Sequence, residues 1–350
     1  MTQFTAEQAG LRDAVRSLLA KRSDSAAVRK AIETEVGHDA ELWRTLCEQI
    51  GVAALAIPEQ YGGAGASLVE THIVLDELGR TLTPAPLLGT VLAAELLVAL
   101  GDAAACERLL PRIAAGDIVS VAWADDKGWR EGAASFANGR VDGTAHYVLD
   151  GDLAEVLLVV TPDAIVEVDP SATGVRRVHT PTMDPTRRLA RIDFDGANGA
   201  PLTGDATSAR MHLQDVACVA VSADAVGAMT RVLEMTVEYS KLRVQFGRPI
   251  GSFQALKHRM ADLHVVVEAA RSASYAAVAA TLHPSVAKAY CCESFCTVAG
   301  EAIQLHGGIA ITWEHDAHLY FKRAHGDAHL FGQPAEHIAR MAAIAGIEDR

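Results

Sequence analysis

Two short stretches of this chain carry the residue types that a buried pyrophosphate needs. The first is Arg243-Val-Gln-Phe-Gly-Arg-Pro-Ile-Gly-Ser-Phe-Gln254, and the second, about sixty residues later, is Gln304-Leu-His-Gly-Gly308. Arginine offers a planar fork of donors and a permanent positive charge. Paired glycines let the backbone come close to a phosphate, because they carry no Cβ. Together the two stretches predict a pyrophosphate-binding site.

Basic side chains gather around the first stretch, although the chain as a whole carries a net charge of -13. They are Lys241, Arg243, Arg248, Lys257 and Arg259. The overall charge disfavours nucleic acid and anionic membranes as partners. It would also repel an anionic ligand at long range, so such a ligand needs this local basic site. The alternative interpretation of the cluster is a solvated helix face.

Length and composition narrow the class of protein further. A chain of 350 residues and 37.0 kDa predicts two or three domains. No apolar run reaches the length of a membrane span, and the first residues lack the basic start and apolar core of a signal peptide. Six cysteines without paired spacing beyond Cys291-Cys292 predict buried thiols in a reducing compartment. We therefore expect a cytoplasmic protein that does not contact membranes.

The composition changes twice along the chain. Residues 1–116 have apolar residues at helical spacing, interrupted by a Pro/Gly-rich break at 58–65. Residues 117–212 contain short β-branched runs, at 156–161, 164–169 and 191–195. Residues 213–350 return to long helical, Ala-rich patterns. The prediction is an α+β multidomain chain with these three segments as its domains.

The chain resembles the acyl-CoA dehydrogenase family over its whole length. Three motifs carry the resemblance: Ile-Pro-Glu-Gln-Tyr-Gly-Gly-Ala-Gly at 57–65, residues 239–262 around Arg243-Val-Gln-Phe-Gly, and Gln304-Leu-His-Gly-Gly308 followed by residues 313–320. The resemblance implies the family's fold, which is an N-terminal helical domain, a central β-domain and a C-terminal four-helix bundle. The bundle would carry FAD binding and oligomerisation.

The resemblance also implies FAD as cofactor and assigns residues to it. Arg243 and Gln245 would bind the pyrophosphate and adjacent groups, and Gln304 with the backbone that follows would hold the adenosine-diphosphate half. In this family these groups reach across a dimer interface, so each chain holds the distal half of its neighbour's flavin. The full set assigned in this way is Arg243, Gln245, Phe246, Phe253, Gln254, Gln304, Leu305, Gly307 and Gly308.

Each of these residues has a plain structural alternative. Phe246 is equally typical of a hydrophobic core, and Gln304 of a helix cap. Arg243 could instead form an ion pair with Glu238 or Asp262.

The carboxylate that the family's chemistry requires is missing from both of its usual places. In the family a carboxylate takes the α-proton of an acyl thioester while the β-hydrogen passes to the flavin as hydride. Most members carry this glutamate near the C-terminus, where Phe331 stands here, and a minority carry it on the first helix of the bundle, where Ala217 stands. Asp224 is on the right helix face but about 10 Å further along the axis. Asp215 faces elsewhere, and we interpret Glu314 as structural.

The segment that bonds the flavin ring in the family is altered as well. The corresponding stretch is Val121-Ala-Trp-Ala-Asp-Asp-Lys-Gly-Trp129, which contains neither Thr nor Ser. Trp123 or Trp129 could stack on a ring, or occupy the core or the surface.

These departures favour one function over two alternatives. The preferred hypothesis is the base-lacking subunit of a heteromeric acyl-CoA dehydrogenase, which completes the FAD site of a homologous catalytic chain. Its substrate would be an acyl-CoA ester, such as a fatty-acyl or steroid side-chain ester, and its electron acceptor an electron-transfer flavoprotein. The alternatives are a self-sufficient homo-oligomer with a relocated base, Asp224 or another acid, and a flavin-free scaffold that binds acyl-CoA. A hetero- or homotetramer built through the bundle is expected.

Overall fold

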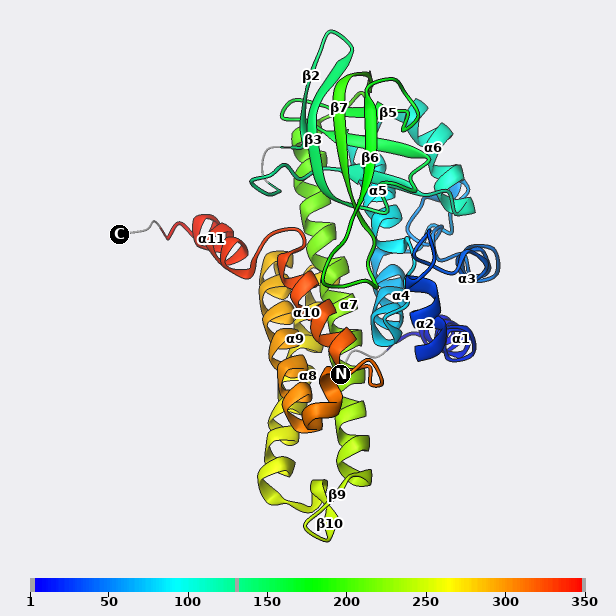
Figure 1. Cartoon of the computed structure of the whole chain (residues 1–350). Helices are drawn as coiled ribbons and strands as arrows, with labels where there is room; N and C mark the ends of the chain where they lie inside the picture. Colours follow the sequence, from blue (N-terminus) through cyan, green and yellow to red (C-terminus); the bar gives the residue numbers. More distant parts are fainter. Residues whose placement is uncertain (1–3, 130–131, 348–350) are drawn as a thin grey trace.

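The N-terminal part of the protein is a helical layer. The computed structural model describes residues 4–129 and 132–347 (Figure 1). Thr5 and Ser67 begin their helices with capping boxes, in which a side chain three residues on returns a bond to the cap. The helices are α1 (Ala6–Arg22), α2 (Ser25–Ile32), α3 (Ala40–Thr45), α4 (Leu68–Thr81), α5 (Leu87–Leu100) and α6 (Ala103–Ala115), with short turns η1 (Leu46–Ile50) and η2 (Glu59–Tyr61).

The middle of the chain forms two four-stranded sheets. One has the order β1-β4-β5-β8, in which β1 and β4 are parallel, and the other has the antiparallel order β2-β3-β7-β6. The strands are β1 (Val119–Ala122), β2 (Ala134–Ala137), β3 (Arg140–Leu149), β4 (Val156–Val160), β5 (Ile165–Val168), β6 (Val175–Thr180), β7 (Leu189–Asn198) and β8 (Ala200–Pro201). β4 is buried along its whole length, which explains its continuous apolar sequence.

The C-terminal part is a bundle of long helices (Figure 1). Its helices are α7 (Ala206–Leu242), α8 (Gln254–Val278), α9 (Pro284–His306), α10 (Ala317–His329) and α11 (Pro334–Ile344). A small hairpin of β9 (Val244–Gln245) and β10 (Arg248–Pro249), then η3 (Ile250–Ser252), joins α7 to α8 at one end of the bundle (Figure 1). η4 (Gly307–Ile311) follows α9.

The order of helices, strands and helices is the one that the sequence predicts. The predicted runs at 156–161, 164–169 and 191–195 fall on β4, β5 and β7. α7 already begins at Ala206, before the predicted start of the third segment at 213, because Asp205 caps it by accepting from Thr207 and Ser208. All six cysteines are free thiols, and five of them are buried as expected, whereas Cys296 is half-buried.

One expectation about apolar segments needs correction. α7 is long and apolar enough, by length and composition, to cross a membrane, although the sequence pattern indicated that no segment is. Its most apolar window is 89% buried inside the protein, so the helix serves as the core of the bundle.

Two glycines allow α4 and α7 to pack at very short range. A Cβ at Gly227 would lie 1.8 Å from the backbone oxygen of Asp76, and a Cβ at Gly79 would lie 2.2 Å from the backbone oxygen of Asp224. Only glycine permits this approach, because any side chain would overlap the facing backbone. The contact joins the N-terminal helices to the bundle and fixes the position of Asp224 relative to α4.

We expect Gly227→Ala to lower the free energy of unfolding by at least about 2 kcal/mol, since overpacking of this kind forces backbone shifts. Chemical denaturation of the chain measures it. Gly10→Ala is the matched control, because a Cβ at Gly10 in α1 meets nothing within 4 Å. It should raise stability by about 0.5–1 kcal/mol through helix propensity. Equal effects of the two substitutions would contradict the close-packing argument.

Candidate functional site

The first predicted motif forms an exposed tip at the end of the bundle. α7 ends at Leu242, and β9 pairs with β10 through a two-residue turn at Phe246 and Gly247. Both turn residues have positive φ, 53° and 77°, as the favoured two-residue hairpin turns require. The turn holds Phe246 outward, so that 89% of its surface is exposed. The plain core interpretation of Phe246 therefore does not hold for the single chain.

The other side chains assigned to FAD are also largely free of partners in this chain. Arg243, Gln245, Gln254 and Gln304 are exposed, as are Gly307 and Gly308, whereas Phe253 is half-buried and Leu305 is buried. Within residues 4–129 and 132–347 the guanidinium of Arg243 makes no ion pair. Gln304 lies inside α9, whose C-cap is Gly307, so it does not cap the helix.

The two motifs meet through stacked rings although they lie on different helices. Tyr239, one turn before Arg243 on α7, stacks on His306 with ring centroids 4.5 Å apart and planes at 29°. His306 is the residue immediately before Gly307, the first glycine of the Gly-Gly step. The backbone amide of Arg243 donates to Tyr239 O over 2.9 Å, which fixes the arginine one turn beyond the stack. The structure thus brings Arg243 and the Gly-Gly step to the same end of the bundle.

An exposed arginine, amide side chains and two bare glycine backbones fit a phosphate group. They present donors and close backbone approach without any competing partner in the described chain. FAD bound there would lie against another molecule, because these groups face outward.

The segment that the resemblance assigns to the flavin ring contributes two tryptophan side chains to an aromatic cluster. Trp123 is 2% exposed, and its ring lies 5.3 Å from Trp129 and 6.1 Å from Phe331. Trp129 and Phe331 approach edge to face at 4.9 Å. Ala217 belongs to the same hydrophobic cluster as Trp123 and Phe331. The two places where the family carries its base are therefore apolar and belong to one large hydrophobic cluster.

A strained turn points Phe331 into this core. Phe331 has φ 61°, a left-handed conformation that is costly for a residue with a Cβ, and is only 1% exposed. His337 Nε2–H donates to Phe331 O over 3.1 Å and holds the turn. Burial lowers the pKa of His337 to about 4, so the imidazole is neutral at neutral pH. Phe331 stands where the family carries its carboxylate, and its ring cannot accept an α-proton.

Trp129 lines two cavities, of about 480 and 310 Å³. The larger lies toward α11 and also borders Phe331, and the smaller lies toward Tyr147 and the end of α10. The described 121–129 segment offers neither of them a Ser or Thr hydroxyl. It therefore lacks the side-chain donors that the resemblance associates with the flavin ring.

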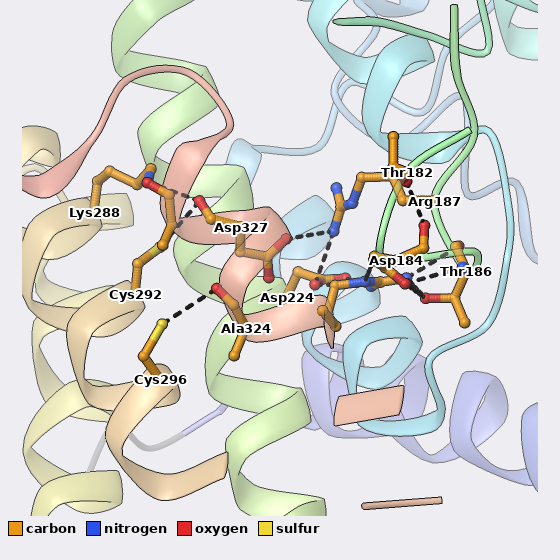
Figure 2. Close-up of polar contacts among 12 residues, drawn as sticks. Thr182, Asp184, Thr186, Arg187, Asp224, Lys288, Cys292, Cys296, Ala324 and Asp327 are labelled. Carbon is orange, nitrogen blue, oxygen red and sulfur yellow. Dashed lines mark hydrogen bonds and ion pairs between the residues drawn. The ribbon is translucent and has the colours of Figure 1, made fainter. Parts of the chain in front are cut away.

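Asp224, the candidate relocated base, lies in a buried ion-pair cluster (Figure 2). Arg323 Nη1 donates to both of its carboxylate oxygens over 3.0 Å, and Arg187 Nη2 donates to Oδ2 over 3.0 Å. Burial alone would raise the pKa of Asp224, but Arg323 and Arg187 outweigh it and hold the pKa below its usual range. A carboxylate bound by two guanidiniums and with a lowered pKa is a poor proton acceptor.

The cluster connects the β-region to the bundle (Figure 2). Arg323 on α10 also donates from Nε to Asp184 over 2.7 Å and from Nη2 to Thr186 Oγ1 over 2.6 Å, both in the segment between β6 and β7. Asp327 Oδ1 lies 2.9 Å from Arg187 Nη2. Burial, opposed by Arg187, raises the pKa of Asp327 well above its usual range.

Sequence reasoning did not identify Arg187, Arg323 and Asp327 as partners of Asp224. One signal was available, since Asp224 is the only charge in a long apolar part of α7, and an isolated buried carboxylate requires a cation. The other two acids considered are elsewhere. Asp215 pairs with Arg340 at 2.9 Å, and Glu314 is exposed.

Comparison with known proteins agrees with this architecture. Residues 5–117 match the acyl-CoA dehydrogenase N-terminal domain, and residues 210–345 match the acyl-CoA dehydrogenase C-terminal domain. The chain belongs to the acyl-CoA dehydrogenase family. The family is one of FAD-dependent oxidoreductases, and its fold is the one described above.

Individual relatives are similar over nearly their whole length. The acyl-CoA dehydrogenase IpdE2 of Mycobacterium tuberculosis is 45% identical over 343 residues, which cover 96% of this chain and 96% of that protein. The solved ChsE4-ChsE5 complex from Mycobacterium tuberculosis matches with a TM-score of 0.90 at 27% identity, covering 100% of both chains. A solved steroid ACAD, Tcur3481-Tcur3483, matches with a TM-score of 0.88 at 28% identity, covering 97% of this chain and 98% of that chain.

Proposed function

We propose that this acyl-CoA dehydrogenase-family chain is the base-lacking subunit of a heteromeric enzyme that desaturates an acyl-CoA thioester between its α and β carbons. It would contribute the residues that bind the distal half of FAD in the site of a homologous catalytic chain. That chain would supply the flavin-ring contacts and the glutamate that takes the α-proton. The observation that carries the proposal is an asymmetry. Arg243 and the Gly-Gly step are exposed, while Phe331 and two tryptophans form an apolar cluster where the resemblance places the base and the flavin-ring contacts.

The roles of the residues that this chain would contribute to FAD binding follow from their chemistry. Arg243 would pair with the pyrophosphate, Gln245 and Gln304 would bond adjacent polar groups, and the Gly307 and Gly308 backbone would approach the adenosine-diphosphate half. Phe246, which is 89% exposed, would pack on the cofactor beside Phe253 and Gln254. FAD, when bound, supplies the acceptor for the β-hydrogen as hydride. The residues of this chain bind and orient it, and they neither remove nor donate a substrate proton.

The names of similar proteins support the partner and the substrate class. The ChsE4-ChsE5 structure is described as a complex, and Tcur3481-Tcur3483 is described as a steroid enzyme. We infer a homologous partner chain, a tetramer built through the bundle, and a bulky ring-bearing acyl-CoA as substrate. Electrons would leave to an electron-transfer flavoprotein, and the enzyme would work in the cytoplasm.

The visible spectrum of the purified protein tests the proposal. The chain should carry no flavin when purified alone, and flavin should appear when it is co-expressed with a homologue that retains the glutamate. Flavin on the isolated chain that bleaches with acyl-CoA would instead establish a self-sufficient enzyme. Absence of flavin in both preparations would establish a scaffold.

Turnover by the assembled enzyme separates the partner's base from the acids of this chain. We expect Asp224→Asn and Glu314→Gln to leave turnover per bound flavin within about twofold, because neither carboxylate would act on substrate. Replacing the partner's glutamate should cost about 10²–10⁴ in rate, which is the usual contribution of a general base. Steady-state rates normalised to flavin absorbance measure both. A hundredfold loss in Asp224→Asn with flavin still bound would mean that the base has moved to Asp224.

A further inference from the structure

The stacked rings between the two flavin motifs have no role in the function proposed so far. They form a compact group of three rings. The His306 ring is stacked on Tyr239 and tilted against His315, with ring centroids 4.5 Å from each. The Tyr239 and His315 centroids lie 6.2 Å apart, so the three rings form a triangle.

The central ring is fixed in position and in protonation. His306 is 4% exposed, and its Nδ1–H donates to Ala302 O over 2.8 Å. This bond selects the tautomer in which Nε2 carries no proton, and Nε2 has no partner among the described residues. Burial lowers the pKa of His306, so the ring is neutral at neutral pH. A neutral ring stacks without introducing a buried charge.

The segment that carries the His315 ring is anchored from the N-terminal part of the chain. Arg29 on α2 donates from Nη2 to His315 O over 3.3 Å and to Asp316 Oδ1 over 2.6 Å. His315 Nδ1 accepts the amide of Ala317 over 3.1 Å at the start of α10. The three rings therefore connect α7, through Tyr239, with α2 and α10, through the contacts of His315.

Tyr239 and His306 each lie close in sequence to one part of the predicted phosphate clamp, which consists of Arg243 and the Gly307–Gly308 backbone. Arg243 is one helical turn, about 6 Å, beyond Tyr239. Gly307 directly follows His306 and has φ 67°. The Tyr239–His306 contact therefore joins the last turns of α7 and α9 close to the arginine and to the Gly-Gly step.

We propose that Tyr239 and His306 are positioning residues that hold Arg243 and the Gly307–Gly308 backbone at the separation needed to clamp the pyrophosphate of a partner's FAD. This inference rests on the proposed function of the chain. The rings do not contact the cofactor. They act by keeping the ends of two helices at a fixed distance, so that binding does not have to order them.

Flavin retention by the complex with the co-expressed homologue tests the inference. The dissociation constant for FAD is measured by titrating the apo-complex and following flavin fluorescence. We expect His306→Leu, which fills the space without a stacking ring, to weaken FAD binding about tenfold, equivalent to about 1.4 kcal/mol. His306→Phe, which keeps a neutral ring, should bind FAD within about twofold of the original chain. Tyr239→Leu and Tyr239→Phe should follow the same pattern.

A double-mutant cycle with Arg243→Ala separates positioning from general stability. Because both residues act on one clamp, the losses in His306→Leu and Arg243→Ala should combine to less than their sum. Additive losses, or equal losses in the Leu and Phe variants, would overturn the inference while leaving the proposed function intact. If Arg243→Ala itself leaves FAD binding unchanged, the proposed function fails, and the positioning role fails with it.

Discussion

Replacing Arg323 by methionine is expected to lower the free energy of unfolding by about 3–5 kcal/mol, since it removes one partner from a buried ionic network. Arg323 is 3% exposed and binds Asp184, Asp224 and Thr186 at once. Methionine keeps most of the side-chain volume but offers no donor. Asp184 would lose its guanidinium and keep the Thr186 amide and hydroxyl as donors. Asp224 would depend on Arg187, which already faces Asp327 as well.

Denaturant unfolding of the chain measures this loss, and the exposed pair on β7 supplies the control. Arg191 is 51% exposed and pairs with Asp193 at 2.8 Å. Arg191→Met removes an arginine–aspartate pair of similar length, but in water, so it should cost less than about 1 kcal/mol. A similarly small loss in Arg323→Met would show that the buried cluster does not hold the β-region to the bundle.

The balance of charges within the cluster explains why Arg323 matters so much. Three carboxylates, Asp184, Asp224 and Asp327, face two guanidiniums, those of Arg187 and Arg323. Burial raises the pKa of Asp327 well above its usual range, which reduces the negative charge that the two guanidiniums must balance. Loss of Arg323 leaves Asp184 and Asp224 buried with less compensating positive charge.

The architecture could be predicted from local sequence because the spacing of apolar residues in each segment matches the helix or strand that the segment forms. Short β-branched runs at 156–161 and 164–169 became β4 and β5, and the Ala-rich pattern after 254 became α8. These elements depend on neighbours in sequence. The start of α7 could not be placed exactly, because its cap is a single side chain, Asp205, in a polar stretch.

Part of the candidate site could likewise be predicted from local sequence, and part depends on contacts between residues far apart in the chain. The Arg243 and Gly-Gly motifs are local sequences, and their exposure follows from a two-residue hairpin turn and a helix end. The environment of Asp224 could not be derived, because Arg187 and Arg323 lie 37 and 99 residues away. The aromatic cluster was equally hidden, since it needs the left-handed turn at Phe331 to bring that ring onto Trp129.

Arg243→Ala is expected to weaken FAD binding by the assembled complex by about 2–5 kcal/mol, if the pyrophosphate contact is buried there. The guanidinium makes no ion pair within the described residues, so its removal leaves no buried carboxylate behind in this chain. The stability of the isolated chain should therefore change little. The loss would fall on the cofactor, whose pyrophosphate would keep its negative charge in the interface without a matching cation.

The ratio of flavin to protein in the purified complex, and the FAD dissociation constant of its apo-form, measure this effect. Arg248→Ala is the matched control, because Arg248 is an exposed arginine of the same hairpin whose guanidinium lies over the Phe253 ring at 4.1 Å. It removes the same charge from the same surface, so it should reproduce any long-range attraction without the direct contact. We expect the loss for Arg243→Ala to exceed that for Arg248→Ala by at least tenfold. Equal losses would mean that the hairpin attracts FAD by its overall charge and that Arg243 has no specific contact with the pyrophosphate.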